Sequence, residues 1–159
     1  MSNKKLAIIA TKGTLDWGYP PFILASTAAA LGYDVEIFFT FYGLQLLKKK
    51  MNLQVSPLGN PGMPMPMGMD KWFPVIGTAI PGMQSIMTMM MKAKMKDKGV
   101  ASLEELRELC IEAEVKITAC QMTVDLFDFT QDELISGVDY AGAAKFFEFA
   151  GDSDICLYI

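Results

Sequence analysis

The sequence predicts a single α/β domain in which a central, mainly parallel sheet is flanked by helices. Short apolar runs, typical of strands, alternate with longer helix-compatible segments, and the connections between them are short. The chain has 159 residues, close to the length of one domain, and 52% of them are apolar. A chain of this size buries about two-thirds of its surface, so it can form a core without disulfide or metal cross-links. We therefore interpret residues 1–159 as one domain.

The first fifty residues predict one strand–helix–strand–helix unit. The continuous apolar run that opens it is typical of a strand buried on both faces. Gly32 suits the C-cap of the Ala-rich helix, and Pro20 and Pro21 suit its first turn, where a missing N–H has little effect. The expected elements are a strand at 6–11, a helix at 22–31, a strand at 34–40 and a short helix at 42–50.

The segment at about 52–98 interrupts this pattern. Prolines and glycines predict a loop over 52–71, and the twenty residues 72–91 carry no charge. We do not favour a membrane span, because Pro74, Gly77, Pro81 and Gly82 interrupt the run. We expect an apolar helix from about 82 to 96 that packs against another subunit, since an exposed apolar surface of this size is unfavourable on a monomer. Alternating methionines at 63, 65, 67 and 69 are interpreted as packing residues, not as copper ligands.

The remaining residues continue the alternation of helices and strands. Ser102 with Glu105, and Thr130 with Glu133, are spaced as capping boxes that open helices. The expected elements are a helix at 103–114, a strand at 115–120, a short helix at 132–136, a helix at 141–150 and a strand at 154–159.

Composition excludes several classes of function. The chain has no histidine, so it contains neither Ser-His-Asp nor Cys-His machinery, nor a His-ligated metal site. A net charge of −4 and the absence of glycine-rich phosphate loops argue against nucleic acid and nucleotides as partners. Three unevenly spaced cysteines and an N-terminus without signal-peptide organisation predict a cytoplasmic protein. We expect no metal and no cofactor.

Cys120 is the strongest candidate for chemistry. It closes a predicted parallel strand, and ligand sites gather at the carboxyl ends of such strands. A helical turn starting at Gln121 would favour its thiolate, whereas Asp125 and Asp128 would oppose it. The alternative is a small buried apolar residue. The other two cysteines are interpreted as core residues, Cys110 in the apolar stripe of its helix and Cys156 in the last strand, although Cys110 is also a candidate resolving thiol for Cys120.

Several segments, taken in order, resemble the DsrE/DsrF/DsrH-like family, in particular its longer DsrE-like subgroup. No single motif decides the match, but their order and spacing cover nearly the whole chain. The segments are Gly13-Thr14-Leu15-Asp16, 38–44, 63–69, 92–99, Ala119-Cys120-Gln121-Met122-Thr123-Val124-Asp125, 137–138 and 157–159.

The resemblance implies a DsrE-like three-layer sandwich and a homo-oligomer, a trimer or a tetramer. It also implies a sulfur-transfer protein that carries sulfane sulfur on Cys120 as a persulfide or thiosulfonate and passes it to an acceptor thiol, such as that of a TusA-like carrier. Gly13, Gln121, Met122 and Thr123 are then candidate substrate-binding residues. Whether such a protein is a sulfurtransferase or a stoichiometric carrier stays open.

Two other interpretations of the sequence remain. The first is a non-catalytic oligomeric binding module that docks a partner or a membrane face through its Met-rich surface. The second is a dithiol redox protein that uses Cys110 and Cys120.

Overall fold

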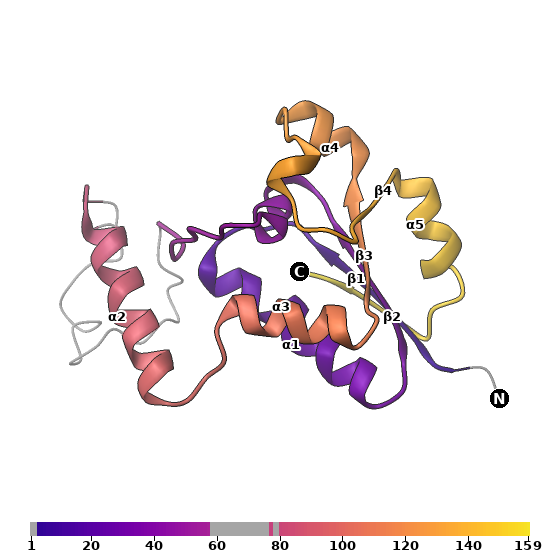
Figure 1. Ribbon diagram of the computed structural model, residues 1–159, viewed down its shortest axis with the longest axis horizontal. Helices are drawn as coiled ribbons and strands as arrows, with labels where there is room; N and C mark the ends of the chain where they lie inside the picture. Colours follow the sequence, from indigo (N-terminus) through magenta and orange to yellow (C-terminus); the bar gives the residue numbers. More distant parts are fainter. Residues whose placement is uncertain (1–2, 58–76, 78–79) are drawn as a thin grey trace.

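The computed structural model describes residues 3–57, 77 and 80–159, and the described strands form one parallel sheet (Figure 1). Its order is β4-β3-β2-β1-β5, and every neighbouring pair is parallel. The strands are β1 (Lys5–Ala10), β2 (Asp34–Phe39), β3 (Lys116–Cys120), β4 (Asp139–Ala141) and β5 (Ile155–Tyr158). The α-helices are α1 (Leu15–Ala30), α2 (Met83–Asp97), α3 (Leu103–Glu112), α4 (Gln121–Leu126) and α5 (Ala143–Ala150), and the 3₁₀-helices include η1 (Phe41–Leu47) and η4 (Gln131–Glu133). The predicted α/β class is confirmed.

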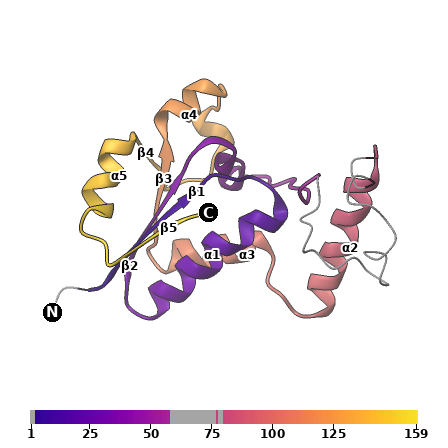
Figure 2. The ribbon, with the colours of Figure 1, turned by 180° about the vertical axis from the view of Figure 1, so that it is seen from behind.

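Helices cover the two faces of this sheet unequally. Figures 1 and 2 show α1 and α3 together on one face and α5 on the other. The larger core cluster lies beneath α1 and α3, and it contains fully buried side chains such as Phe22, Ile37 and Phe39. The cluster beneath α5 is much smaller within the described part of the chain. Its buried members are Ala7, Phe38, Cys120 and Phe146.

Helix α1 begins at Leu15, well before the predicted start, and Pro20 and Pro21 therefore lie inside it. Our placement of these prolines in the first turn was wrong. Each proline removes one intrahelical N–H donor near the helix start. Contacts from outside hold this end instead, because the Leu15 N–H donates to the Gln54 carbonyl at 2.9 Å. That contact is tertiary, so local sequence signals do not reveal the true helix start.

Four further predictions need correction. The short helices expected at 42–50 and 132–136 are present as the 3₁₀-helices η1 and η4, with shorter bounds than predicted. Strand β4 was not expected, and α5 begins at Ala143 because Ala141 still belongs to that strand. The tight η1 turn follows from its contact with β1, where a Cβ added to Gly43 would lie 2.2 Å from the Ala10 carbonyl oxygen.

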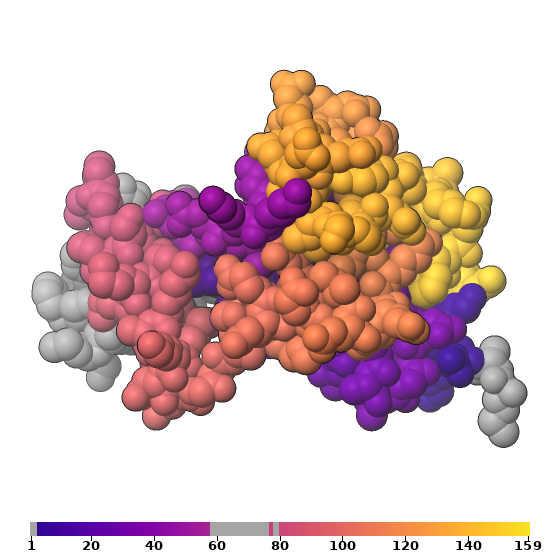
Figure 3. All heavy atoms as spheres, viewed as in Figure 1, coloured from indigo at the N-terminus to yellow at the C-terminus, as the bar shows by residue number. Residues whose placement is uncertain are grey.

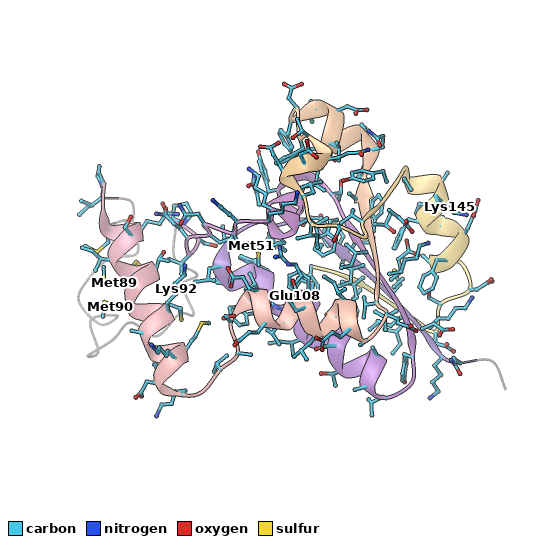
Figure 4. The ribbon with its side chains drawn as sticks, in the orientation of Figure 1. Met51, Met89, Met90, Lys92, Glu108 and Lys145 are labelled. Atoms are coloured by element: carbon cyan, nitrogen blue, oxygen red, sulfur yellow. The ribbon has the colours of Figure 1, made fainter. Side chains whose placement is uncertain are left out.

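The expected apolar helix is present as α2, and it is joined to the sheet domain through residues 53–56. The Val55 N–H donates to the Thr88 hydroxyl at 3.0 Å, and the Gln84 amide donates to the Val55 carbonyl at 2.8 Å. Figure 3 shows α2 at one end of the molecule. Met89 and Met90 extend from its outer side in Figure 4, and they are 69% and 41% exposed.

No helix among the described residues is long and apolar enough to cross a bilayer. The methionines at 63, 65, 67 and 69 and most of the uncharged run before α2 lie outside the described residues.

Candidate functional site at the carboxyl edge of the sheet

Cys120 is the last residue of β3 and the N-cap residue of α4. The three predicted substrate-binding residues that follow Cys120 differ in their exposure to solvent. Gln121 and Met122 are exposed, whereas Thr123 is fully buried. The Thr123 hydroxyl lies 3.2 Å from the Thr40 hydroxyl and accepts the Phe41 N–H at 3.3 Å. Thr123 therefore ties α4 to the end of β2, and Gln121 and Met122 form the exposed start of the helix.

The Cys120 side chain lies on the α5 face of the sheet. It is 5% exposed and shares the small cluster with Phe38 and Phe146, whose rings stack with centroids 4.9 Å apart. A thiol in this position is close to the surface at the strand end but is covered by a single helix. Access to this thiol is therefore limited by the packing of α5, and reactive thiols need access to their substrate.

A buried charge occupies the same face. Glu36 is fully buried, accepts a hydrogen bond from the Thr118 hydroxyl at 2.8 Å and pairs with Lys116 at 3.2 Å. Side chains alternate along a strand, so Lys116, Thr118 and Cys120 face the same side of β3. The pairing satisfies the Glu36 carboxylate, which explains how it is tolerated beneath α5. The sequence analysis did not identify Glu36, because the sequence around a single glutamate in an apolar strand does not reveal its partners on another strand.

Cys110 lies on the opposite side of the sheet from Cys120. It is fully buried between α1 and α3, and its Sγ donates to the Phe22 carbonyl oxygen at 3.4 Å. Burial raises the pKa of the Cys110 thiol to about 11. The core interpretation of Cys110 is confirmed, and the structure does not bring the two thiols together.

Cys156 is exposed, so its assignment to the core was wrong. It belongs to β5, the edge strand, where Ile155 and Tyr158 are also exposed. The apolar residues around Cys156 resemble a buried strand in the sequence. As the edge strand, β5 leaves three of its four side chains exposed, and only Leu157 packs against the core cluster. All three cysteines are free.

Gly13 lines a pocket of about 300 Å³ at the end of β1. A Cβ at this position would lie 2.1 Å from the Tyr42 carbonyl oxygen, so only glycine permits the close approach of the loop after β1 to η1. Gly13 thus lines a cavity on the same edge of the sheet as Cys120, and its role in substrate binding stays a prediction. The remaining lining residues are Lys12, Thr14, Trp17, Tyr42, Gln45 and Ser56.

Sequence reasoning did not single out these lining residues as a site. The Lys12 Nζ lies 3.2 Å from the centroid of the Trp17 ring, and the Ser56 hydroxyl donates to Asp16 at 2.8 Å. Lys12 and Thr14 follow the carboxyl end of β1, which was their only local signal. Ser56 comes from the segment leading to α2, and only the fold brings it to β1.

Aromatic side chains connect the pocket to the helix that follows Cys120. Tyr42 stacks on Phe127 with ring centroids 5.7 Å apart, and Phe127 also contacts Phe41 and Phe129. Phe41 has a φ of 48°, a backbone conformation unusual for a bulky residue. Phe41, Tyr42 and Phe127 are all exposed, and this aromatic cluster thus extends from the pocket to the end of α4.

The described residues contain no group of three acidic or cysteine side chains placed to hold a metal ion. What they place at this edge is a thiol, a lysine-containing pocket and an aromatic cluster that extends from the pocket to the end of α4. Fold and site together define an all-parallel α/β protein with a thiol at the end of a central strand.

This chain belongs to the DsrE/DsrF/DrsH-like family, whose model matches residues 2–158. The resemblance inferred from the sequence is therefore confirmed. The chain is 80% identical over its full length, and over the full length of the relative, to the sulfur carrier protein DsrE2 of Allochromatium vinosum. It is 33% identical to the protein YrkE of Bacillus subtilis, with 99% of this chain and 98% of that protein covered.

A solved structure shares the fold. The ychN protein from E. coli superposes with a TM-score of 0.55, covering 98% of this chain and 99% of its own, at 11% sequence identity. This likeness confirms the DsrE-like α/β architecture that the sequence predicted.

Proposed function

We propose that this protein carries sulfane sulfur on Cys120 and passes it to an acceptor thiol on another protein. The observation that carries the proposal is the position of Cys120 at the carboxyl end of β3, in a chain 80% identical to a protein named as a sulfur carrier. Cytoplasmic reducing conditions would keep its free cysteines available. A small carrier of the TusA-like kind is our expected acceptor, and whether the protein turns over as a sulfurtransferase does not affect this chemistry.

Loading is a thiol exchange at sulfur. With tetrathionate as donor, the Cys120 thiol loses its proton to solvent and the thiolate attacks a central sulfur. A bond forms between Sγ and that sulfur, the central S–S bond breaks, and thiosulfate leaves with the electron pair. Cys120 then carries a thiosulfonate. With a polysulfide donor, the same attack leaves a persulfide, and the shortened polysulfide departs.

Unloading reverses the roles of the sulfur atoms. The thiolate of the acceptor attacks the outer sulfur held on Cys120, the bond from Sγ to that sulfur breaks, and Cys120 leaves as a thiolate. The stacked pair Phe38 and Phe146 covers the thiol, so α5 must be displaced for a protein acceptor to reach it.

Intact-mass measurement after exposure to tetrathionate or polysulfide tests the proposal. Cys156 is exposed and therefore accessible to the same donors, so the comparison uses Cys156→Ser as the parent protein. We expect the parent to gain an adduct that dithiothreitol removes, and Cys156→Ser with Cys120→Ser to gain none. An adduct of equal yield in the double variant would show that Cys120 is not the carrier.

A second candidate function is a non-catalytic oligomeric binding module, favoured by the exposed Ile86, Met89 and Met90 of α2. On this alternative, α2 packs against other copies, as a trimer or tetramer, or docks a partner or membrane face. It predicts that Met89→Glu changes the assembly size in light scattering and that Cys120→Ser leaves partner binding intact. A Met89→Glu protein of unchanged size and unchanged partner binding would eliminate it.

A further inference from the structure

We propose that the buried carboxylate of Glu36 opposes the packing of α5 on the sheet and so sets how often Cys120 is exposed. This inference rests on the proposed function, because it names a determinant of access to the same thiol. It is carried by the position of Glu36, by the source of its polar contacts and by the hydration that a carboxylate loses on burial.

Glu36 lies beneath the helix that covers Cys120. Side chains alternate along a strand, so Glu36 is on the same face of β2 as Phe38, whose ring stacks on Phe146 of α5. In the sheet register Glu36 is level with Ala7 on β1, a fully buried member of the same small cluster. Helix α5 covers this face, and α1 and α3 cover the other (Figure 2). Packing of α5 therefore buries Glu36 and Cys120 together.

The polar contacts of this carboxylate come from the sheet. It accepts a hydrogen bond from the Thr118 hydroxyl at 2.8 Å and lies 3.2 Å from the Lys116 Nζ, and both partners belong to β3. Within the described part of the chain, α5 donates no hydrogen bond to Glu36. The charged side chains of α5, Lys145 and Glu148, pair with each other at 2.6 Å and are 59% and 67% exposed. Packing of α5 thus removes water from Glu36 without giving it a counterion.

The two contacts with β3 do not depend on α5. Because Glu36 and its partners all lie on the sheet, they stay together when α5 opens, and the Lys116 side chain is 38% exposed even when α5 is packed. The contacts therefore contribute to both arrangements, whereas the lost hydration of the carboxylate disfavours only the closed one. Burial of Phe146 against Phe38 acts in the opposite direction and favours closure. Glu36 and Phe146 thus have opposite effects on the exposure of Cys120.

Neutralising Glu36 tests this balance. In Glu36→Gln, alkylation of Cys120 by iodoacetamide should slow about tenfold or more relative to the exposed Cys156, as followed by peptide mapping. Amide hydrogen exchange should show slower exchange in α5. Glu112→Gln, which removes an exposed carboxylate from α3, is the matched control and should label at the parent rate.

A purely structural role of Glu36 predicts the opposite result, since loss of its contacts with β3 would loosen the sheet and accelerate labelling. Unchanged or faster labelling of Cys120, with Cys110 still unlabelled, would overturn the proposal, as would unchanged exchange in α5. If Cys110 is labelled as well, Glu36→Gln has unfolded. The same two measurements then decide with Glu36→Met combined with Thr118→Val, which replaces the buried polar pair by apolar groups of similar size.

Sulfur uptake distinguishes failure of this inference from failure of the proposed function. In the Cys156→Ser parent, Glu36→Gln should also slow the formation of the tetrathionate adduct on Cys120. A parent that gains no adduct overturns the proposed function even if Glu36→Gln slows alkylation. A parent that gains the adduct, with alkylation unchanged in Glu36→Gln, supports the function and overturns the role of Glu36.

Discussion

The two faces of the sheet bury one cysteine each and protect it to very different degrees. Cys110 lies beneath α1 and α3 within the large cluster, whereas Cys120 lies beneath α5, whose one buried side chain is Phe146. Gly142 and Gly151 flank α5, and a Cβ at Gly142 would meet nothing within 4 Å. One face therefore serves as the main core, and we expect the cover of Cys120 on the other face to open without unfolding of the whole protein.

The largest effect on stability is expected from a substitution on the face of the sheet that α1 and α3 cover. Phe22 is fully buried and contacts Phe39, with ring centroids 5.8 Å apart. Phe22→Ala should lower the free energy of unfolding by about 3–5 kcal/mol, because it leaves a cavity between α1 and the sheet. Urea denaturation measures the loss. Ile23→Ala is the control on the same helix and should have a much smaller effect, since Ile23 is 43% exposed. Equal losses would mean that this face is not the main source of stability.

On the face covered by α5, a comparable truncation should change reagent access to Cys120 more than it changes the stability of the protein. Phe146→Ala removes the side chain that covers Cys120, so alkylation of Cys120 by iodoacetamide should accelerate about tenfold or more, while Cys110 stays unlabelled. Peptide mapping over time resolves the three cysteines, and Cys156 serves as the exposed reference.

The matched control for this labelling is Phe147→Ala. Phe147 neighbours Phe146 on α5 but is 65% exposed, so its loss should leave Cys120 labelling at the parent rate. If the labelling of Cys110 and that of Cys120 accelerate together in Phe146→Ala, the variant unfolds globally and α5 is not an independent cover.

The ionisation of Cys110 is expected to have a smaller effect on the free energy of unfolding. Burial raises its thiol pKa from 9.0 to about 11, so the folded state favours the neutral form. The resulting stability is present below pH 9 and is lost as the pH rises towards 11, by roughly 1–3 kcal/mol. Unfolding free energies of the parent and of Cys110→Ala at pH 8 and pH 10.5 measure this. The difference between the two proteins should shrink at the higher pH, and a constant difference would contradict the assigned burial.

Prediction from the sequence succeeded where a signal is local and failed where contacts are distant. The Ser102–Glu105 capping box is present, with both of its hydrogen bonds formed, because both partners lie within four consecutive residues. The prolines at 20 and 21 misplaced the start of α1, because residue 54 secures that end from elsewhere in the chain. Cys156 was misassigned, because neighbouring apolar residues do not reveal that β5 is an edge strand.

The features of the candidate site likewise fall into those that the sequence predicted and those that it did not. Cys120 was found from its position at a strand end, since the carboxyl ends of parallel strands meet at one edge, and Gly13 was named through the family resemblance. The covering of Cys120 by Phe146 and the pocket formed with Ser56 were not predictable, because their partners are separated by tens of residues.

By itself, the sequence determined the alternation of strands and helices, the absence of histidine chemistry and the choice of Cys120 at a strand end. These follow from residue type and local periodicity, which do not depend on how the chain is packed. Only the tertiary structure decided that Cys110 and Cys120 face opposite sides of one sheet, that α5 covers Cys120 and that Lys12 lies in a pocket with Ser56. Such relations depend on strand order and on which face of the sheet each helix covers, and distant segments of the chain set both.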